Sequence, residues 1–278
     1  MTRFLFFRRF VFPPIAPPPE ISFLSASIRA ARAVPGSLFA LFFPALCRVC
    51  RQPIPLFTTV PVCTDCLQAV QPYEGLECAK CGLFLEGPTV LHGTVFCGLC
   101  RRGAFVFEQA RSFGWYEGTL RTLIHCLKYD GFRPLGKPLG RHLAGVARRF
   151  DARSFHLALP VPLYAKRQRR RGFNQAALLA AQLSKIYGIP MAAQDCVRVR
   201  DTRPQTGLRA AERRKNVARA FHVPFPERVK SRRVLLIDDV LTTGATADSC
   251  ARALLDAGAE GVWVATLARV HSRNIDVL

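Results

Sequence analysis

Eight of the eleven cysteines occur in four C-x-x-C pairs between residues 47 and 100. Two thiolates that are two residues apart on a tight turn can reach one tetrahedral metal ion with bonds of about 2.3 Å, whereas a disulfide framework has no reason to repeat this interval. The spacing therefore predicts metal binding, and a reducing, cytoplasmic setting follows from it. The predicted ligands are Cys47, Cys50, Cys63, Cys66, Cys78, Cys81, Cys97 and Cys100.

The four pairs predict two structural zinc ions, each in a small zinc ribbon. Sites with four cysteine ligands are closed, so the metal contributes to folding and not to catalysis. We prefer sequential pairing, with the first two pairs on one ion and the last two on the other, but crossed pairing stays open. The ribbons either staple a segment that has no core of its own or also contact nucleic acid. The remaining cysteines, Cys126, Cys196 and Cys250, are expected to be small core side chains.

Two adjacent acids, Asp238 and Asp239, follow an apolar run that starts at Val234 and indicates a buried parallel strand. A strand that stops at this pair places two carboxylates at the C-terminal edge of the sheet, where ligands of open α/β folds bind. Vicinal acids suit vicinal hydroxyl groups. The Thr/Gly loop that follows can turn its N–H groups and threonine hydroxyls toward a phosphate at the N-terminus of the next helix. The simpler alternative is a strand that ends in two solvated acids before an ordinary helix.

The thirteen residues 234–246 resemble the 5-phosphoribosyl pyrophosphate (PRPP) signature of type I phosphoribosyltransferases: an apolar strand, two acids, small residues and Thr-Thr-Gly. The resemblance implies that Asp238 and Asp239 hold the ribose hydroxyls. It also implies a 5-phosphate site made of Thr242, Thr243, Gly244, Ala245 and Thr246. The sequence contains no Walker A or G-x-G-x-x-G loop, so nucleoside triphosphate and dinucleotide sites lack support.

An arginine-rich run follows the proline turn at residues 160–162, and a second basic segment lies between residues 203 and 221. Arginines at a strand edge can bind a pyrophosphate or a nucleic-acid backbone in bidentate fashion, although a solvated cationic face is the usual explanation for such a run. Lys128 and Tyr129, at the end of an expected helix, are a further candidate phosphate contact.

The motifs R-G-F-N-Q, R-P-Q-T-x-L, R-R-x-N and A-F, together with the cysteine module, resemble the ComF (competence protein F) family over residues 40–270. The family is associated with uptake and processing of transforming DNA. The resemblance implies phosphoribosyl transfer from PRPP with Mg²⁺ to an acceptor that the sequence does not reveal. The residues implied to contact pyrophosphate or nucleic acid are Arg171, Asn174, Gln175 and Arg203. The alternative is a non-catalytic accessory protein that holds single-stranded DNA for the uptake machinery.

The net charge of +21, from 40 basic and 19 acidic residues, predicts phosphate-rich partners without choosing among them. An uninterrupted apolar stretch of about 20 residues, as a transmembrane helix needs, does not occur. The chain length of 278 residues suits one ordinary domain with a small module.

Alternating apolar runs and amphipathic stretches after residue 104 predict an α/β fold, with a mostly parallel sheet and flanking helices as in type I phosphoribosyltransferases, preceded by the small zinc-ribbon module. Strands are expected at residues 110–116, 156–160, 197–200, 233–238 and 261–268. Helices are expected at residues 119–129, 138–150, 174–187 and 246–257. The segment 203–221 fits neither pattern and is predicted to be a mobile loop that closes over the site.

Three parts of the chain are expected. Residues 1–35 form a basic, proline-rich and disordered extension, residues 36–103 the double zinc ribbon and residues 104–278 the phosphoribosyltransferase-like domain. Within the ribbon part, the apolar residues 36–46 are expected to cover the metal module. The extension is a loose tail or a signal peptide, or else the start codon has been assigned too far upstream and the segment is never made.

Overall fold

The computed structural model describes residues 45–55, 58–85, 94–150, 155–201 and 219–271. These residues belong to one compact unit that runs from residue 44 to residue 278. The predicted extension at residues 1–35 and most of the apolar element at residues 36–46 lie outside the described residues. The predicted loop at residues 203–221 also lies outside them, apart from its last three residues.

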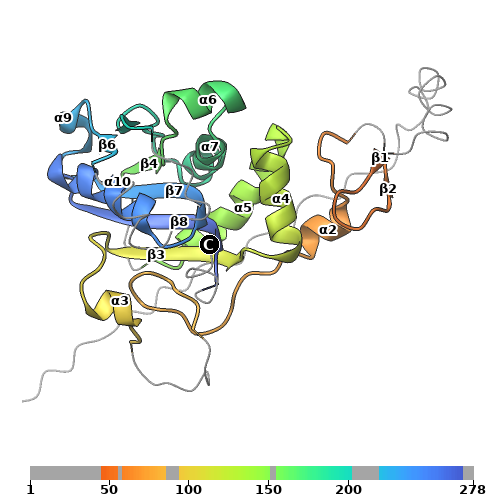
Figure 1. The fold of residues 1–278 in the computed structure, drawn as a ribbon, viewed down its shortest axis with the longest axis horizontal. Helices are drawn as coiled ribbons and strands as arrows, with labels where there is room; N and C mark the ends of the chain where they lie inside the picture. Colours follow the sequence, from red (N-terminus) through yellow and green to blue (C-terminus); the bar gives the residue numbers. More distant parts are fainter. Residues whose placement is uncertain (1–44, 56–57, 86–93, 151–154, 202–218, 272–278) are drawn as a thin grey trace, which may run out of the picture. The chain divides into compact units, whose positions relative to one another are not determined.

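Four parallel strands form the central sheet in the order β3-β8-β7-β4 (Figure 1). They are β3 (Gln109–Trp115), β4 (Leu157–Pro160), β7 (Arg233–Leu241) and β8 (Gly261–Arg269). Side chains alternate between the two faces of a strand, and all four residues from Val234 to Ile237 in β7 are fully buried. Both faces of the sheet are therefore covered, as is usual for a parallel sheet.

Helices cover both faces of this sheet. The helix α10 (Ala245–Asp256) packs with Val234 and Leu236 on one face. The helices α4 (Gly118–Lys128), α5 (Gly136–Ala147) and α7 (Gln175–Tyr187) pack with Leu235 and Ile237 on the other. In α4 the buried apolar residues recur at helical spacing, at positions 120, 123, 124 and 127. Shorter elements are η2 (Arg133–Leu135), α6 (Ala165–Arg171) and α9 (Pro226–Val229).

The α/β class predicted from the sequence is confirmed, and four of the expected strands and all four expected helices end within three residues of the predicted positions. The fifth expected strand differs. It is β5 (Val197–Arg198), which pairs antiparallel with β6 (Phe221–His222) outside the main sheet. The arginine-rich run was not predicted to be a helix, yet it forms α6, since Ala, Lys, Gln and Arg all have high helix propensity.

The strand β7 was predicted to stop at the acid pair, but it continues to Leu241. The reason is that β8 pairs with it along its whole length, up to the pair Leu241 and Arg269. Its other neighbour, β4, ends at Pro160 opposite Ile237. Asp238 and Asp239 therefore lie in a strand at the point where one of its two neighbours stops, and that edge opens toward the site.

The described residues of the cysteine module, 45–55, 58–85 and 94–103, contain little regular structure. The strands β1 (Ala45–Leu46) and β2 (Pro53–Ile54) form a short antiparallel pair. Two short helices, α2 (Thr64–Gln68) and α3 (Gly98–Arg101), begin directly after Cys63 and Cys97. The described residues contain no helix that is long and apolar enough to span a membrane.

Candidate functional site

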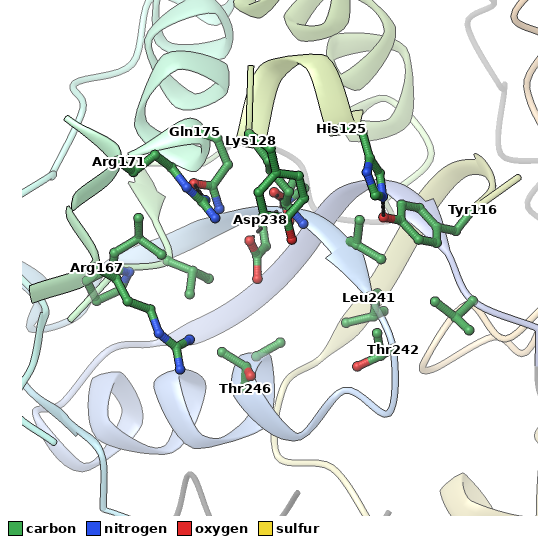
Figure 2. A pocket seen from close by; sticks show the side chains of 18 of the residues that line it. Tyr116, His125, Lys128, Arg167, Arg171, Gln175, Asp238, Leu241, Thr242 and Thr246 are labelled. Atoms are coloured by element: carbon green, nitrogen blue, oxygen red, sulfur yellow. Dashed lines mark hydrogen bonds and ion pairs between the residues drawn. The ribbon is translucent and has the colours of Figure 1, made fainter. Parts of the chain in front are cut away.

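A cavity of about 450 Å³ opens at the carboxyl ends of β7 and β8, between α4, α6, α7 and the start of α10. Figure 2 shows Asp238 between arginine side chains on one side and the threonines of the following loop on another. Most of the residues that the sequence analysis selected come together here. Those that line the cavity are Lys128, Tyr129, Arg171, Gln175, Asp238, Asp239, Thr242, Gly244 and Thr246.

The acid pair is held in place by two contacts. The backbone N–H of Asp239 donates to Oδ1 of Asp238 at 2.8 Å. The ammonium group of Lys128 lies 2.9 Å from Oδ2 of Asp239, and the Asp239 side chain is only 5% exposed. The last residue of α4 thus neutralises one of the two carboxylates.

Burial and repulsion from Asp239 raise the pKa of Asp238 to about 8, although Lys128 acts in the opposite direction. Burial also disfavours the charge on Lys128, but attraction to Asp239 and Asp238 outweighs burial and raises its pKa. Lys128 is therefore charged at neutral pH, whereas Asp238 exchanges a proton near neutrality.

The Thr/Gly loop leads into α10 with its N–H groups at the positive end of a helix of twelve residues. Gly244 has a φ of +80°, and a Cβ atom there would lie 2.9 Å from Cε1 of Phe105. Thr243 is buried, and its hydroxyl accepts from the N–H of Ala245 at 3.4 Å. Thr242, Gly244 and Thr246 line the cavity, while Thr243 and Ala245 support the turn.

The R-G-F-N-Q motif connects α6 to α7. Gly172 ends α6 with a φ of +77°, which lets the chain reverse. The Arg171 guanidinium donates to Oε1 of the buried Gln175 and lies 5.5 Å from the ring centroid of Tyr129. Arg171 and Gln175 therefore reach the cavity as one hydrogen-bonded unit.

Asn174 has a different position. Its Oδ1 accepts from the N–H of Ala176 and its Nδ2 donates to the carbonyl of Val161, both at 3.0 Å. It caps α7 and fixes the turn after β4, and it is not among the residues that line the cavity. Its predicted ligand contact stays a prediction. Arg203 lies outside the described residues.

Several cavity residues were missed in the sequence. Arg121 and His125 are two of them, and they lie on one face of α4 with the predicted Lys128, at spacings of four and three, a signal that was available. Nε2 of His125 lies 2.9 Å from the Tyr116 hydroxyl, and burial, with the nearby cations, lowers the His125 pKa. Arg167 on α6 and Arg198 on β5 also line the cavity, and nothing in the local sequence of Arg198 indicated this.

The eight cysteines gather into two clusters of four, in sequential order, with the Sγ atoms of each cluster within 4.8 Å of one another. A tetrahedral ion with bonds of about 2.3 Å places its sulfur ligands about 3.8 Å apart. The Cys50 and Cys63 sulfurs are 3.7 Å apart, and those of Cys81 and Cys97 are 3.6 Å apart. Each cluster thus has the donor set and spacing of a structural zinc site.

Backbone N–H groups point at these sulfurs, which favours thiolates. The N–H of Cys63 lies 3.4 Å from Sγ of Cys47, and that of Cys97 lies 3.3 Å from Sγ of Cys78. The second cluster also contacts the sheet, because the buried Arg269 at the end of β8 donates to the Cys81 carbonyl at 2.6 Å. The second cluster and the central sheet are packed as one structure.

The parallel sheet, the acid pair at its carboxyl edge and the Thr/Gly loop at the start of α10 define a protein with a phosphoribosyltransferase fold. The family model described as "Phosphoribosyl transferase domain" matches residues 169–277.

Comparison with curated proteins narrows this class. The chain is 35% identical over 234 residues to DNA utilization protein YhgH of Salmonella typhimurium. The aligned residues cover 82% of this chain and 99% of that protein. It is 34% identical to competence protein F of Haemophilus influenzae, over 75% of this chain and 90% of that protein. It is 26% identical to competence protein ComFC of Bacillus subtilis, over 71% and 79%. The chain belongs to the ComF (competence protein F) family.

Proposed function

We propose that the chain binds PRPP in this cavity and transfers its phosphoribosyl group to an acceptor. The observation that carries the proposal is that Asp238, Asp239 and three residues of the loop, Thr242, Gly244 and Thr246, line one cavity together with four arginines. An acid pair suits ribose hydroxyls, a helix N-terminus suits a phosphate, and arginines suit a pyrophosphate.

The placement of the ligand follows from these preferences. The 5-phosphate lies against Thr242, Gly244 and Thr246 at the start of α10, and the ribose hydroxyls face Asp238. The pyrophosphate then points to the opposite side of the cavity. The arginines there are Arg167, Arg171 and Arg198.

In the reaction, the bond between the first ribose carbon and the pyrophosphate oxygen breaks, and a bond from that carbon to the acceptor nucleophile forms. Positive charge develops on the sugar ring while negative charge collects on the pyrophosphate. The arginines stabilise the leaving group, and the acid pair and the loop hold the sugar in place. The main task of the protein is positioning and electrostatic stabilisation.

The Mg²⁺ expected with PRPP stays a prediction. The acid pair is a poor site for a metal ion held by the protein, because Oδ2 of Asp239 is already 2.9 Å from Lys128. A magnesium ion that arrives with PRPP would be held mainly by oxygens of the ligand. The two cysteine clusters, in contrast, fit two structural zinc ions, which also suits a reducing, cytoplasmic setting.

Calorimetric titration of zinc-loaded protein with PRPP tests the proposal, beside an Asp238→Asn/Asp239→Asn variant. We expect the variant to lose affinity by about 100-fold, since each lost hydrogen bond to a charged group costs about 1.5–3 kcal/mol. Asp256→Ala, at the exposed far end of α10, is the control and should bind as the wild type does. If the folded wild type does not bind PRPP, the proposal is wrong.

The relatives' names, competence protein F and DNA utilization protein, suggest that the reaction serves the uptake or use of DNA. A second candidate function is single-stranded DNA binding, which α6 favours. Its seven residues include five cations, and none of its side chains is buried. Because Arg167 and Arg171 on this helix also line the cavity, a DNA strand on α6 would pass the cavity entrance.

A variant with Lys166, Arg169 and Arg170 changed to Gln separates the two functions, because these exposed residues do not line the cavity. If α6 binds DNA, the slope of log K against log salt should fall by about 0.7 for each lost phosphate contact. PRPP affinity should stay within about twofold in the same variant. An unchanged salt slope would remove the DNA function from α6.

The boundaries of the expected parts, at residues 35 and 103, remain part of this proposal. We infer that residues 36–103 act as a support for the phosphoribosyltransferase-like region, because Arg269 and Cys81 join the two.

A further inference from the structure

Lys128 is not an ordinary surface lysine. It is the last residue of α4, which is anchored by fully buried Leu123, Ile124 and Leu127 in the preceding turn. Its side chain is 15% exposed, and its Nζ lies 2.9 Å from Oδ2 of Asp239. The helix therefore delivers a positive charge to a fixed point in the cavity.

That point is where a divalent cation would bind a pair of adjacent carboxylates. Mg²⁺ and Mn²⁺ take carboxylate oxygens as ligands, and one or two carboxylates often suffice when a phosphate ligand completes the shell. An ammonium group in contact with Oδ2 of Asp239 repels such an ion strongly, because two positive charges a few ångströms apart in a poorly solvated site repel each other. The other arginines that line the cavity, Arg121, Arg167, Arg171 and Arg198, add to the repulsion.

We propose that Lys128 is the built-in counter-cation of the acid pair and takes the place of a divalent metal ion there. The free protein therefore has no metal site at Asp238 and Asp239. Lys128 also neutralises Asp239, so that a highly anionic ligand meets less repulsion when it enters. The consequence for PRPP binding rests on the proposed function, whereas the consequence for metal binding stands alone.

The consequence for metal binding is tested by titrating zinc-loaded, PRPP-free protein with Mn²⁺. Electron paramagnetic resonance measures the Mn²⁺ that stays free at each step. The wild type should have no site at the acid pair, so an Asp238→Asn/Asp239→Asn variant should bind Mn²⁺ as the wild type does. Lys128→Met should gain one Mn²⁺ site, with an affinity on the order of tenfold or more above the residual Mn²⁺ binding of the wild type, because the nearby charge is gone. Lys128→Met/Asp239→Asn should lose the new site again.

Two further variants keep the test sound. Lys128→Arg retains the charge and should resemble the wild type, and Lys137→Met on the exposed side of α5 is the matched control. If Lys128→Met does not fold, Lys128→Gln, whose side chain is polar but uncharged, replaces it. Equal Mn²⁺ binding at the acid pair by wild type and Lys128→Met, or the absence of a new site in the folded variant, would overturn the inference.

The consequence for PRPP binding is tested by measuring PRPP affinity in magnesium-free buffer. The buffer contains no chelator, because a chelator would remove the zinc. Removing Mg²⁺ should cost Lys128→Met about tenfold more PRPP affinity than it costs the wild type. An equal loss in both proteins would contradict the inference. Failure of the wild type to bind PRPP at any Mg²⁺ concentration would instead refute the proposed function, and the Mn²⁺ result would still decide the role of Lys128.

Discussion

The backbone N–H of Val106 donates to Oδ1 of Asp248 at 2.7 Å. This bond joins the segment that follows the second cysteine cluster to the first turn of α10. In the same segment Phe105 lies against Gly244, and both its ring and the four cysteines of the second cluster belong to one buried core. The metal cluster and the predicted phosphate loop are therefore mechanically connected.

Loss of the second zinc ion should accordingly weaken PRPP binding as well as folding. In a Cys81→Ser/Cys97→Ser variant we expect the melting temperature to fall by about 10 °C or more, since structural zinc contributes several kcal/mol. PRPP affinity should fall by about tenfold in protein that is still folded at low temperature. Zinc content, thermal unfolding and calorimetry measure the three effects.

The comparison is Cys50→Ser/Cys66→Ser in the first cluster, where Cys47, Cys63 and Cys66 pack with the other core, which contains no residue of α10. This variant should lose zinc and some stability but keep PRPP affinity within about threefold of the wild type. Equal losses of affinity in both variants would contradict a specific connection between the second cluster and the loop.

Gly244→Ala should impair the phosphate loop for two reasons. Its φ of +80° is unfavourable for a residue with a Cβ, and the new atom would lie 2.9 Å from Phe105. We expect a stability loss of about 1–3 kcal/mol together with loss of PRPP binding. Gly258→Ala, at a φ of +92° in the turn after α10, should lose stability but keep PRPP affinity. Chemical denaturation and calorimetry on both variants check this difference.

The raised pKa of Asp238 predicts a pH-dependent stability difference. Its pKa is about 8 in the folded protein against an ordinary value of 3.8, so the folded state binds more protons than the unfolded state between these values. Charging Asp238 therefore removes stability as pH rises from about 4 to about 8. Relative to the wild type, Asp238→Asn should gain melting temperature with rising pH over this window. A constant difference between pH 5 and pH 9 would show that Asp238 is not perturbed in this way.

Asn174 and Arg171 should give opposite results. Asn174→Ala removes the cap of α7 and the bond to Val161, and should lower the free energy of unfolding by about 1–2 kcal/mol. Arg171→Gln should leave stability nearly unchanged and lower PRPP affinity by about tenfold, as loss of a charged hydrogen bond does. A larger PRPP effect for Asn174→Ala than for Arg171→Gln would support the predicted ligand contact of Asn174.

Local patterns in the sequence were enough to predict the fold class, the grouping of the eight cysteines around metal ions and the position of the Thr/Gly loop. A C-x-x-C pair, a buried apolar strand and a glycine before a helix each depend on residues close together in the chain, so their meaning does not need the rest of the fold. For the same reason β7 and α10 were predicted to within three residues, although the three residues of β7 beyond Asp238 depend on pairing with β8.

Only the tertiary structure decided how these parts share the site. The contact of Lys128 with Asp239 joins α4 to β7, and the bond from Val106 to Asp248 spans 142 residues. Arg198 lines the cavity from β5, which pairs with β6, and Asn174 caps α7 while it donates to the carbonyl of Val161, directly after β4. Such contacts form between segments that are distant in the chain, and only folding brings them within bonding distance.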